Sequence, residues 1–187
     1  SNHHVLAPLG SGELDIIQPA KNNDGNIDNC VARYFDSYPM HRSKTAFQNL
    51  ADAAIAKLAP NIPITLDLPN KHPLRGVVGR ISPGQQVHMV GSVSGPQTGR
   101  VLKTDFRMAL QYQTPNGFRR VGFRKQILCA RYSQGGDSGS LIVNKSGYAI
   151  GIHVAGNDDY SVFCRLVPVL NHFNCELLIP DIDAQPV

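Results

Sequence analysis

The hydrophobic pattern beyond residue 75 predicts a series of short β-strands. Runs rich in Val, Ile, Phe and Tyr alternate with clusters of Gly, Pro and Asn that favour turns. This spacing of strands and turns is typical of a sandwich or a barrel, so we expect an all-β fold. The expected strands are at 77–81, 86–93, 99–112, 117–130, 138–143, 148–156 and 161–167, and the expected turns between them are at 96–99, 114–117 and 145–147.

The first seventy residues are less regular. Residues 11–30 mix short apolar groups with Gly, Pro and Asn clusters, which indicates loops and hairpins. Segment 43–58 can form a helix, judged by its Ala and Leu content, or a loop followed by a strand at 53–56. We favour the strand because of the motif described below.

Two further features complete the expected organisation. Residues 167–173 predict a short closing helix with Pro168 in its first turn, where proline is tolerated. Pro69 and Pro73 mark a loop that divides the chain into two lobes, at 1–70 and 71–187.

Composition excludes several classes of function. The net charge of +4 is mildly basic, and no series of aromatic residues is interleaved with the densest basic stretch, at 119–125, so we expect no nucleic-acid partner. There is no apolar run of ~18 residues for a membrane span, and no signal peptide is visible. The four cysteines form no C-x-x-C pair, so a zinc site is not expected. No cofactor is expected either. Reduced cysteines and a cytoplasmic, bacterial location fit this composition best.

The chemistry is concentrated at residues 135–140, Gly-Gly-Asp-Ser-Gly-Ser, just before an apolar strand. A serine hydroxyl attacks a carbonyl only when a base takes its proton and donors stabilise the oxyanion. Glycines let successive N–H groups point at one spot, so the N–H groups of Gly136 and Ser138 are candidates for an oxyanion hole. An ordinary hairpin turn is the alternative interpretation of these residues.

Residues 136–139 resemble the nucleophile motif of chymotrypsin-like (trypsin-fold) serine proteases, and the segments 140–143 and 150–156 resemble the strand pair that follows it. The resemblance implies two antiparallel β-barrels and a His-Asp-Ser triad in the cleft between them. It places a histidine at the end of a strand near the start, and an aspartate at the opening of a strand further along.

Both residues are present in that order. Residues 1–7, Ser-Asn-His-His-Val-Leu-Ala, resemble the histidine segment of bacterial trypsin-like proteases related to plant NARROW LEAF proteins, which nominates His4 rather than His3 as general base. Residues 51–56, Ala-Asp-Ala-Ala-Ile-Ala, nominate Asp52 as its orienting carboxylate, and Ser138 is then the nucleophile. Asp67 is the rival to Asp52.

The resemblance also implies a difference. Family members carry a strand hairpin before the histidine, whereas three residues precede His4 here. The expected first barrel therefore lacks its N-terminal strands. That missing segment, or a regulatory domain of the same parent polypeptide, is a possible partner beside the protein or peptide substrate.

The specificity pocket is expected to accept Glu or Gln. Tyr132 stands where trypsin-like members have an acidic residue, which argues against Lys or Arg. His153 resembles the histidine that contacts a Glu or Gln side chain in glutamyl endopeptidases and picornavirus-type proteases, and Ser133 can add a hydrogen bond. The alternative is a half-buried strand histidine that bonds only to the backbone. Residues 154–156, which are Val154, Ala155 and Gly156, are expected to pair with the substrate backbone.

Two other functions remain open at this stage. The chain can be a protease fold that has lost activity and serves as an interaction scaffold. It can also be a viral polyprotein-processing protease with serine as nucleophile, as the run Gly-Ile-His-Val-Ala-Gly-Asn at 151–157 suggests.

Overall fold

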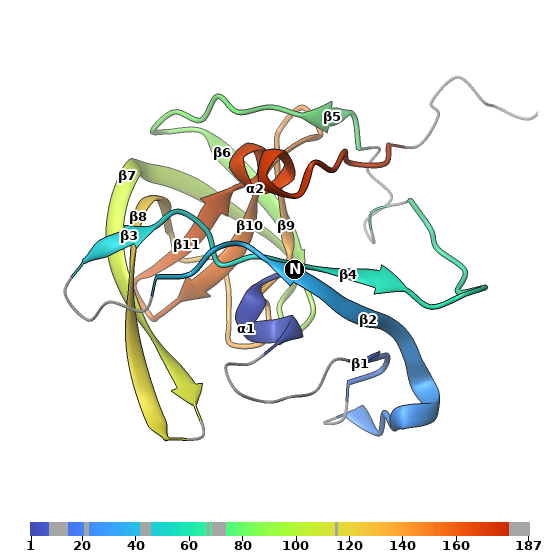
Figure 1. Ribbon diagram of the computed structural model, residues 1–187. Helices are drawn as coiled ribbons and strands as arrows, with labels where there is room; N and C mark the ends of the chain where they lie inside the picture. The colour runs from blue at the N-terminus through green and yellow to red at the C-terminus, as the bar shows by residue number, and fades with distance from the viewer. Residues whose placement is uncertain are drawn as a thin grey trace, which may run out of the picture.

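The computed structural model describes residues 1–7, 15–20, 23–41, 46–66, 68, 74–114 and 116–179. Two β-sheets account for most of them, with a short helix near each end of the described chain (Figure 1). The all-β prediction is therefore confirmed.

The larger sheet closes on itself. Its strands follow the order β11-β10-β9-β6-β7-β8, and β11 also pairs with β8, so that the ring is complete. Every pair in the ring is antiparallel, and closure removes the free edges that an open sheet would expose. The ring strands are β6 (Gln86–Gly91), β7 (Gly95–Thr114), β8 (Gly117–Ala130), β9 (Leu141–Asn144), β10 (Tyr148–Gly156) and β11 (Tyr160–Arg165).

Two short strands join this barrel from outside, both in parallel. β5 (Gly76–Val77) pairs with β10, and β3 (Phe47–Asn49) pairs with β8. β3 comes from the first seventy residues, and the Asn49 side chain secures it by donating to Gly122 O at 2.9 Å. The chain therefore enters the barrel once before it forms the strand that follows Asp52.

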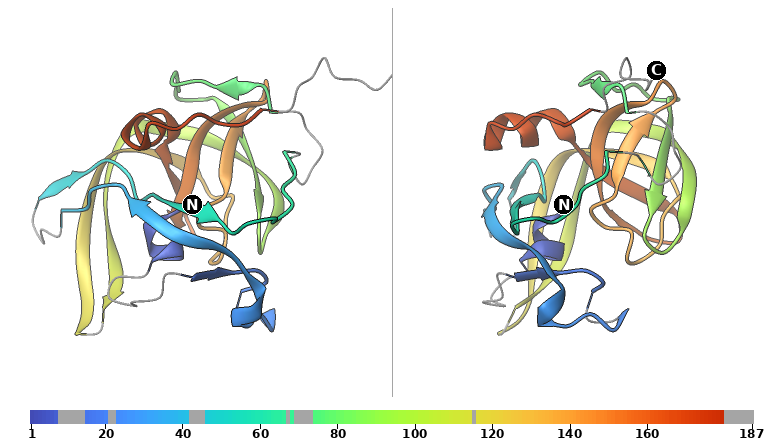
Figure 2. Two further views of the ribbon diagram at one scale, coloured as in Figure 1. Left: turned by 45° about the vertical axis from the view of Figure 1, so that its right-hand side comes forward. Right: turned by 90° about the vertical axis from the view of Figure 1, so that its right-hand side faces the viewer.

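The smaller sheet has the order β1-β2-β4 and is antiparallel; Figure 2 shows it beside the barrel. Its strands are β1 (Asp15–Ile17), β2 (Cys30–Ser37) and β4 (Ala54–Leu58). Three strands do not close a barrel, so among the described residues this lobe is an open sheet. The short helix α1 (His3–Leu6) and the backbone of Ser1, whose carbonyl accepts from the N–H of Ala54 at 2.9 Å, lie against β4.

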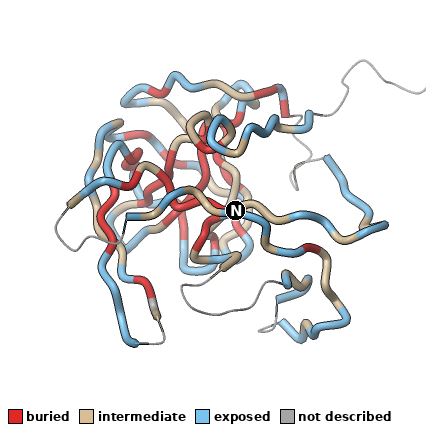
Figure 3. The backbone as a smooth tube through the Cα atoms, viewed as in Figure 1, coloured by how far each residue is buried: buried red, intermediate tan, exposed pale blue. Residues whose placement is uncertain are grey.

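Buried residues gather inside the barrel and on the side of it that faces the smaller sheet (Figure 3). The interior is filled by large side chains such as Ile127, Ile142 and Phe163. A second cluster joins the barrel wall to helix α2 (Leu166–Phe173) and to Ala51 and Ala53, whose small side chains let the chain around Asp52 approach closely. The chain on either side of Asp52 is therefore packed against the barrel wall.

Most of the expected elements are confirmed, and some expectations need correction. The strand reading of segment 53–56 is confirmed by β4, and the closing helix by α2. The turn expected at 96–99 is wrong: those residues belong to β7, and the turn lies at 92–94, where Gly95, with φ 66°, supplies the positive φ that closes a short hairpin. The strand expected at 77–81 is reduced to β5.

Candidate active site

Asp52 is the centre of a hydrogen-bond network between the two sheets. It precedes β4 and is fully buried. Its Oδ1 accepts from the backbone N–H groups of His3 at 2.7 Å and His4 at 3.3 Å, so the carboxylate caps helix α1, which has no side-chain cap of its own. Its Oδ2 accepts from His4 Nδ1 and from the Tyr112 hydroxyl, both at 2.5 Å. The carboxylate thus has a donor for each of its lone-pair directions.

These contacts keep Asp52 ionised. Burial by itself raises the pKa of a carboxyl group, but the hydrogen bond and positive charge of His4, together with the hydrogen bond from Tyr112, outweigh burial and lower the pKa of Asp52 below its usual range. The negative charge is therefore fixed beside the imidazole of His4.

His4 lies on α1, with part of its side chain exposed. Its ring is held from one side by Asp52 and meets the ring of Tyr112 edge-on, at a centroid distance of 6.0 Å. The expectation that this histidine ends a strand is wrong: residues 3–6 form a single helical turn, because the Asp52 carboxylate binds the free N–H groups at its start. With Nδ1 committed to Asp52, Nε2 is the nitrogen available as a base.

Ser138 lies in a loop of small residues between β8 and β9. The backbone of Gly136, with φ 99°, and of Gly139, with φ 90°, occupies the region that favours glycine. A side chain at Gly136 would also collide with Val93, since its Cβ would lie 2.6 Å from Val93 Cγ2. Among the described residues, the N–H groups of Gly136 and Ser138 have no protein acceptor. This arrangement presents two donors at the loop surface.

Asp137 anchors that loop from below. It is buried, and its carboxylate accepts from the backbone N–H groups of Val93, Ser94 and Gln134 at 2.8–3.0 Å. Burial raises the pKa of a carboxyl group, but the hydrogen bonds from Ser94 and from the backbone outweigh it and lower the pKa of Asp137. The turn between β6 and β7 is therefore tied to the residue next to Ser138.

His4 and Ser138 line one cavity of about 510 Å³, together with His153, Val154, Ala155 and Gly156. The structure thus brings most of the nominated site residues to one place. In this structure Ser138 Oγ donates to Val154 O at 3.3 Å, and no hydrogen bond joins it to His4.

The end of β10 borders this cavity as an open edge. β10 and β9 pair as far as Ile152, and the backbone of His153 still bonds Ser140 and Gly139. Beyond His153 no pairing on that side is present among the described residues, and a bulge at Val154 interrupts the register with β11. The backbone of 154–156 is therefore not paired with another strand on the side of the cavity, although Val154 itself is buried and its carbonyl accepts from Ser138 Oγ. An extended peptide could add as a strand at this edge.

His153 is 1% exposed, and its ring is backed by Tyr132, whose hydroxyl lies 3.5 Å from Nδ1. Burial lowers the pKa of His153 to about 4; Asp137 raises it and His4 lowers it to a lesser extent. Tyr132 and Ser133 are buried behind the cavity rather than lining it, and the Ser133 hydroxyl bonds Ser161 Oγ at 2.7 Å.

Solved structures of several bacterial serine proteases resemble the chain. Cellulomonas bogoriensis chymotrypsin is 17% identical, with a TM-score of 0.59 over 83% of this chain and 79% of that chain. Thermobifida fusca protease A is 16% identical, with a TM-score of 0.56 over 79% and 74%. A glutamic acid specific serine protease, described as using a histidine triad in substrate binding, is 16% identical, with a TM-score of 0.54 over 80% and 74%. This is the chymotrypsin fold. No protein-family model matches the sequence, and no curated protein matches it either.

The sequence did not predict one residue of this site, Tyr112. Tyr112 comes from β7, and nothing in its local sequence, Leu-Gln-Tyr-Gln, separates it from any half-buried strand tyrosine. Its contact with Asp52 spans sixty residues of chain and depends on how the β7–β8 hairpin packs against α1.

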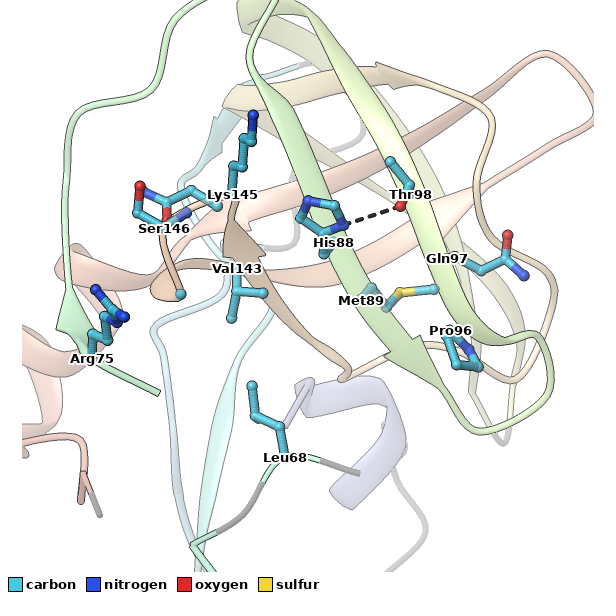
Figure 4. Close-up of a pocket in the computed structure, with 12 residues that line it drawn as sticks. Leu68, Arg75, His88, Met89, Pro96, Gln97, Thr98, Val143, Lys145 and Ser146 are labelled. Carbon is cyan, nitrogen blue, oxygen red and sulfur yellow. Dashed lines mark hydrogen bonds between the residues drawn. The ribbon is translucent and has the colours of Figure 1, made fainter. Parts of the chain in front are cut away.

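A second cavity, of about 660 Å³, lies beside β6, β7 and β9 of the barrel (Figure 4). Its lining includes Val143 and Met89 at the centre and His88, which bonds Thr98 at 3.0 Å; none of His4, Asp52 and Ser138 lines it. Within the described part of the chain, no group of three or more His, Cys, Asp or Glu side chains is placed to hold a metal, and no helix is long and apolar enough to span a membrane. The four cysteines are free.

Proposed function

We propose that the chain is a serine endopeptidase that hydrolyses peptide bonds through an acyl-enzyme on Ser138. The observation that carries the proposal is the network in which buried Asp52 holds His4 while His4 and Ser138 line one cavity. The likeness to serine proteases of the chymotrypsin fold supports it.

The mechanism follows from the hydrogen bonds. Asp52 Oδ2 accepts the Nδ1 proton of His4, so Nε2 carries a lone pair. When substrate binds, Ser138 Oγ leaves its hydrogen bond to Val154 O, attacks the peptide carbonyl carbon and gives its proton to Nε2. The oxyanion binds the N–H groups of Gly136 and Ser138. The C–N bond then breaks as Nε2 returns the proton to the leaving amine.

Deacylation repeats these steps with water. His4 takes a proton from water, the hydroxide attacks the ester carbonyl, and Ser138 Oγ leaves with the proton from Nε2. Asp52 stays ionised throughout and stabilises the imidazolium, in keeping with its lowered pKa. The unpaired edge at 154–156 is the proposed site for the substrate backbone, ahead of the scissile bond.

For the residue before the scissile bond we propose Glu or Gln, held by His153. A buried imidazole with its pKa lowered to about 4 is neutral at pH 7 and carries one N–H proton. Since Tyr132 faces Nδ1, Nε2–H can donate to a side-chain carbonyl oxygen in the cavity. A neutral donor suits the amide of Gln at least as well as the carboxylate of Glu. Ser133 already bonds Ser161 and does not line the cavity, so we propose no direct contact between Ser133 and the substrate.

An inactive scaffold is the second candidate, and one observation favours it: Ser138 Oγ bonds Val154 O instead of His4. The partner segment or regulatory domain of a parent polypeptide, the bacterial cytoplasmic location and the division of the chain near residue 70 all stay predictions. A viral polyprotein-processing role would require Gln or Glu junctions in a longer polyprotein.

The test is a library of fluorogenic peptides varied at the residue before the scissile bond. We expect cleavage after Gln or Glu that is abolished in Ser138→Ala and unchanged in Ser146→Ala, because Ser146 is an exposed turn residue. Cleavage after other residues would refute the role of His153 and keep the triad. No cleavage by folded protein would favour the scaffold.

A further inference from the structure

Two donors share one oxygen of Asp52. His4 Nδ1 and the Tyr112 hydroxyl both lie 2.5 Å from Oδ2, while Oδ1 is occupied by two backbone N–H groups. His4 and Asp52 come from the first sixty residues, whereas Tyr112 comes from β7 of the barrel. The tyrosine is therefore the barrel's only hydrogen-bond donor to this carboxylate among the described residues.

The side chain of Tyr112 is held firmly. It is 4% exposed and packs with Val121 and Phe123 of β8, with a distance of 6.3 Å between the Tyr112 and Phe123 ring centroids. Burial raises the pKa of Tyr112 well above its ordinary value, and the charge of Asp52 raises it further. The hydroxyl therefore keeps its proton at neutral pH and donates it to Oδ2.

The same ring lies edge-on to the imidazole of His4. The two rings meet nearly perpendicular, at 78°, and both residues line the cavity that contains Ser138. Tyr112 therefore contacts both members of the pair, the ring of His4 and Oδ2 of Asp52. Loss of the hydroxyl would leave Oδ2, which is buried, with a single donor.

We propose that Tyr112 is a positioning residue of the His4–Asp52 pair: its hydroxyl fixes the orientation of the carboxylate and draws negative charge from Oδ2. This rests on the proposed function for its effect on catalysis, but not for its effect on His4. With the hydroxyl removed, Asp52 attracts the imidazolium form of His4 more strongly, and the imidazole is also held less rigidly.

The first experiment compares Tyr112→Phe with Tyr148→Phe, a control at the start of β10 whose ring lies beside Gly76 and lines neither cavity. For Tyr112→Phe we expect kcat to fall about 10- to 100-fold, KM to stay within about twofold, and the acidic limb of kcat/KM to move to higher pH. The control should behave as the wild type. A merely structural role would lower the melting temperature without moving the pH limb.

The second experiment does not require activity. Nitrogen-15 NMR of histidine-labelled protein follows the His4 titration, with Ser138→Ala present in every sample to prevent self-cleavage. We expect Tyr112→Phe to raise the His4 titration midpoint and to broaden its Nδ1–H signal. If the wild type cleaves no peptide but the midpoint moves, the positioning role stands and the proposed function fails. If the wild type cleaves and neither limb nor midpoint moves, the positioning role is overturned.

A third variant covers the case in which Tyr112→Phe does not fold. Incorporation of 3-fluorotyrosine at position 112 keeps the ring and makes the hydroxyl a stronger donor. The His4 midpoint should then move to lower pH, opposite to the Phe variant. An unchanged or raised midpoint would overturn the proposal.

Discussion

Replacement of Asp52 by Asn changes one atom of the network and should disable it. The new Oδ1 can still accept from the backbone N–H groups of His3 and His4, but an amide nitrogen takes the place of Oδ2, where two donors meet. The Tyr112 hydroxyl proton then has no acceptor in a buried site, which costs about 1–3 kcal/mol of folding free energy. His4 Nδ1 must become an acceptor, so the proton moves to Nε2, the proposed base.

The expected effect on rate is larger than the effect on stability. The same replacement in a Ser-His-Asp triad lowers kcat about 10⁴-fold, which corresponds to about 5 kcal/mol of transition-state stabilisation. The stability loss depends on pH. Because the folded pKa of Asp52 is below the unfolded value of about 3.9, the carboxylate stabilises the fold at pH 7 and this contribution is lost as the pH falls through the folded pKa.

The assay combines peptide hydrolysis with urea unfolding at pH 7 and at successively lower pH. The deficit of Asp52→Asn should be largest at pH 7 and shrink below about pH 4. Asp158→Asn is the control, because its carboxylate is 98% exposed and its ion pair with Arg131, at 3.5 Å, lies at the surface. Its free energy of unfolding should stay within about 0.5 kcal/mol of the wild-type value. Wild-type kcat in Asp52→Asn, or a deficit independent of pH, would refute the reasoning.

Three further predictions concern the loop and the pocket. Gly136→Ala should lower kcat at least about tenfold and the free energy of unfolding by about 1–3 kcal/mol, because φ at Gly136 is 99° and Val93 occupies the space that a Cβ would need. The control Gly135→Ala, with open space around its Cβ, should keep wild-type stability in thermal unfolding. Equal losses in the two variants would contradict this. Asp137→Asn should also lower kcat and the melting temperature, since an amide cannot accept from both Val93 and Gln134 as the carboxylate does; an unchanged melting temperature would count against the anchor. Burial lowers the pKa of His153 to about 4, so the unfolded state binds more protons than the folded state between about pH 6.5 and pH 4. As the pH falls through that window, the free energy of unfolding of the wild type should fall by up to ~3 kcal/mol, whereas that of His153→Phe should stay nearly constant in urea titrations. Parallel slopes would disprove the burial of a neutral ring.

The sequence was sufficient for the barrel strands because their hydrophobic runs and turn residues are local signals. β2 was missed: the burial along Cys30–Ser37 does not alternate cleanly, so no period of two is visible in its residues. The turn before Pro96 was misplaced because Pro and Gly also occur inside the first residues of β7.

The candidate site was partly predictable, because one part of it is contiguous in the sequence. Ser138 and its glycines form a contiguous motif, but the network around Asp52 joins residues 48 to 60 positions apart. Such contacts leave no periodic signal, and only the fold brings His4, Asp52 and Tyr112 together. The hydrogen bond from Ser138 to Val154 likewise depends on a β-bulge at Val154, which the residue types there do not predict.

The most direct test of the central claim is the reactivity of Ser138 itself. A fluorophosphonate probe, which phosphonylates an activated serine hydroxyl, can be followed by intact-mass measurement and peptide mapping. We predict a single adduct on Ser138, formed much more slowly in His4→Ala and absent in Ser138→Ala. Folded protein that forms no adduct, or that reacts at the same rate without His4, would contradict the account.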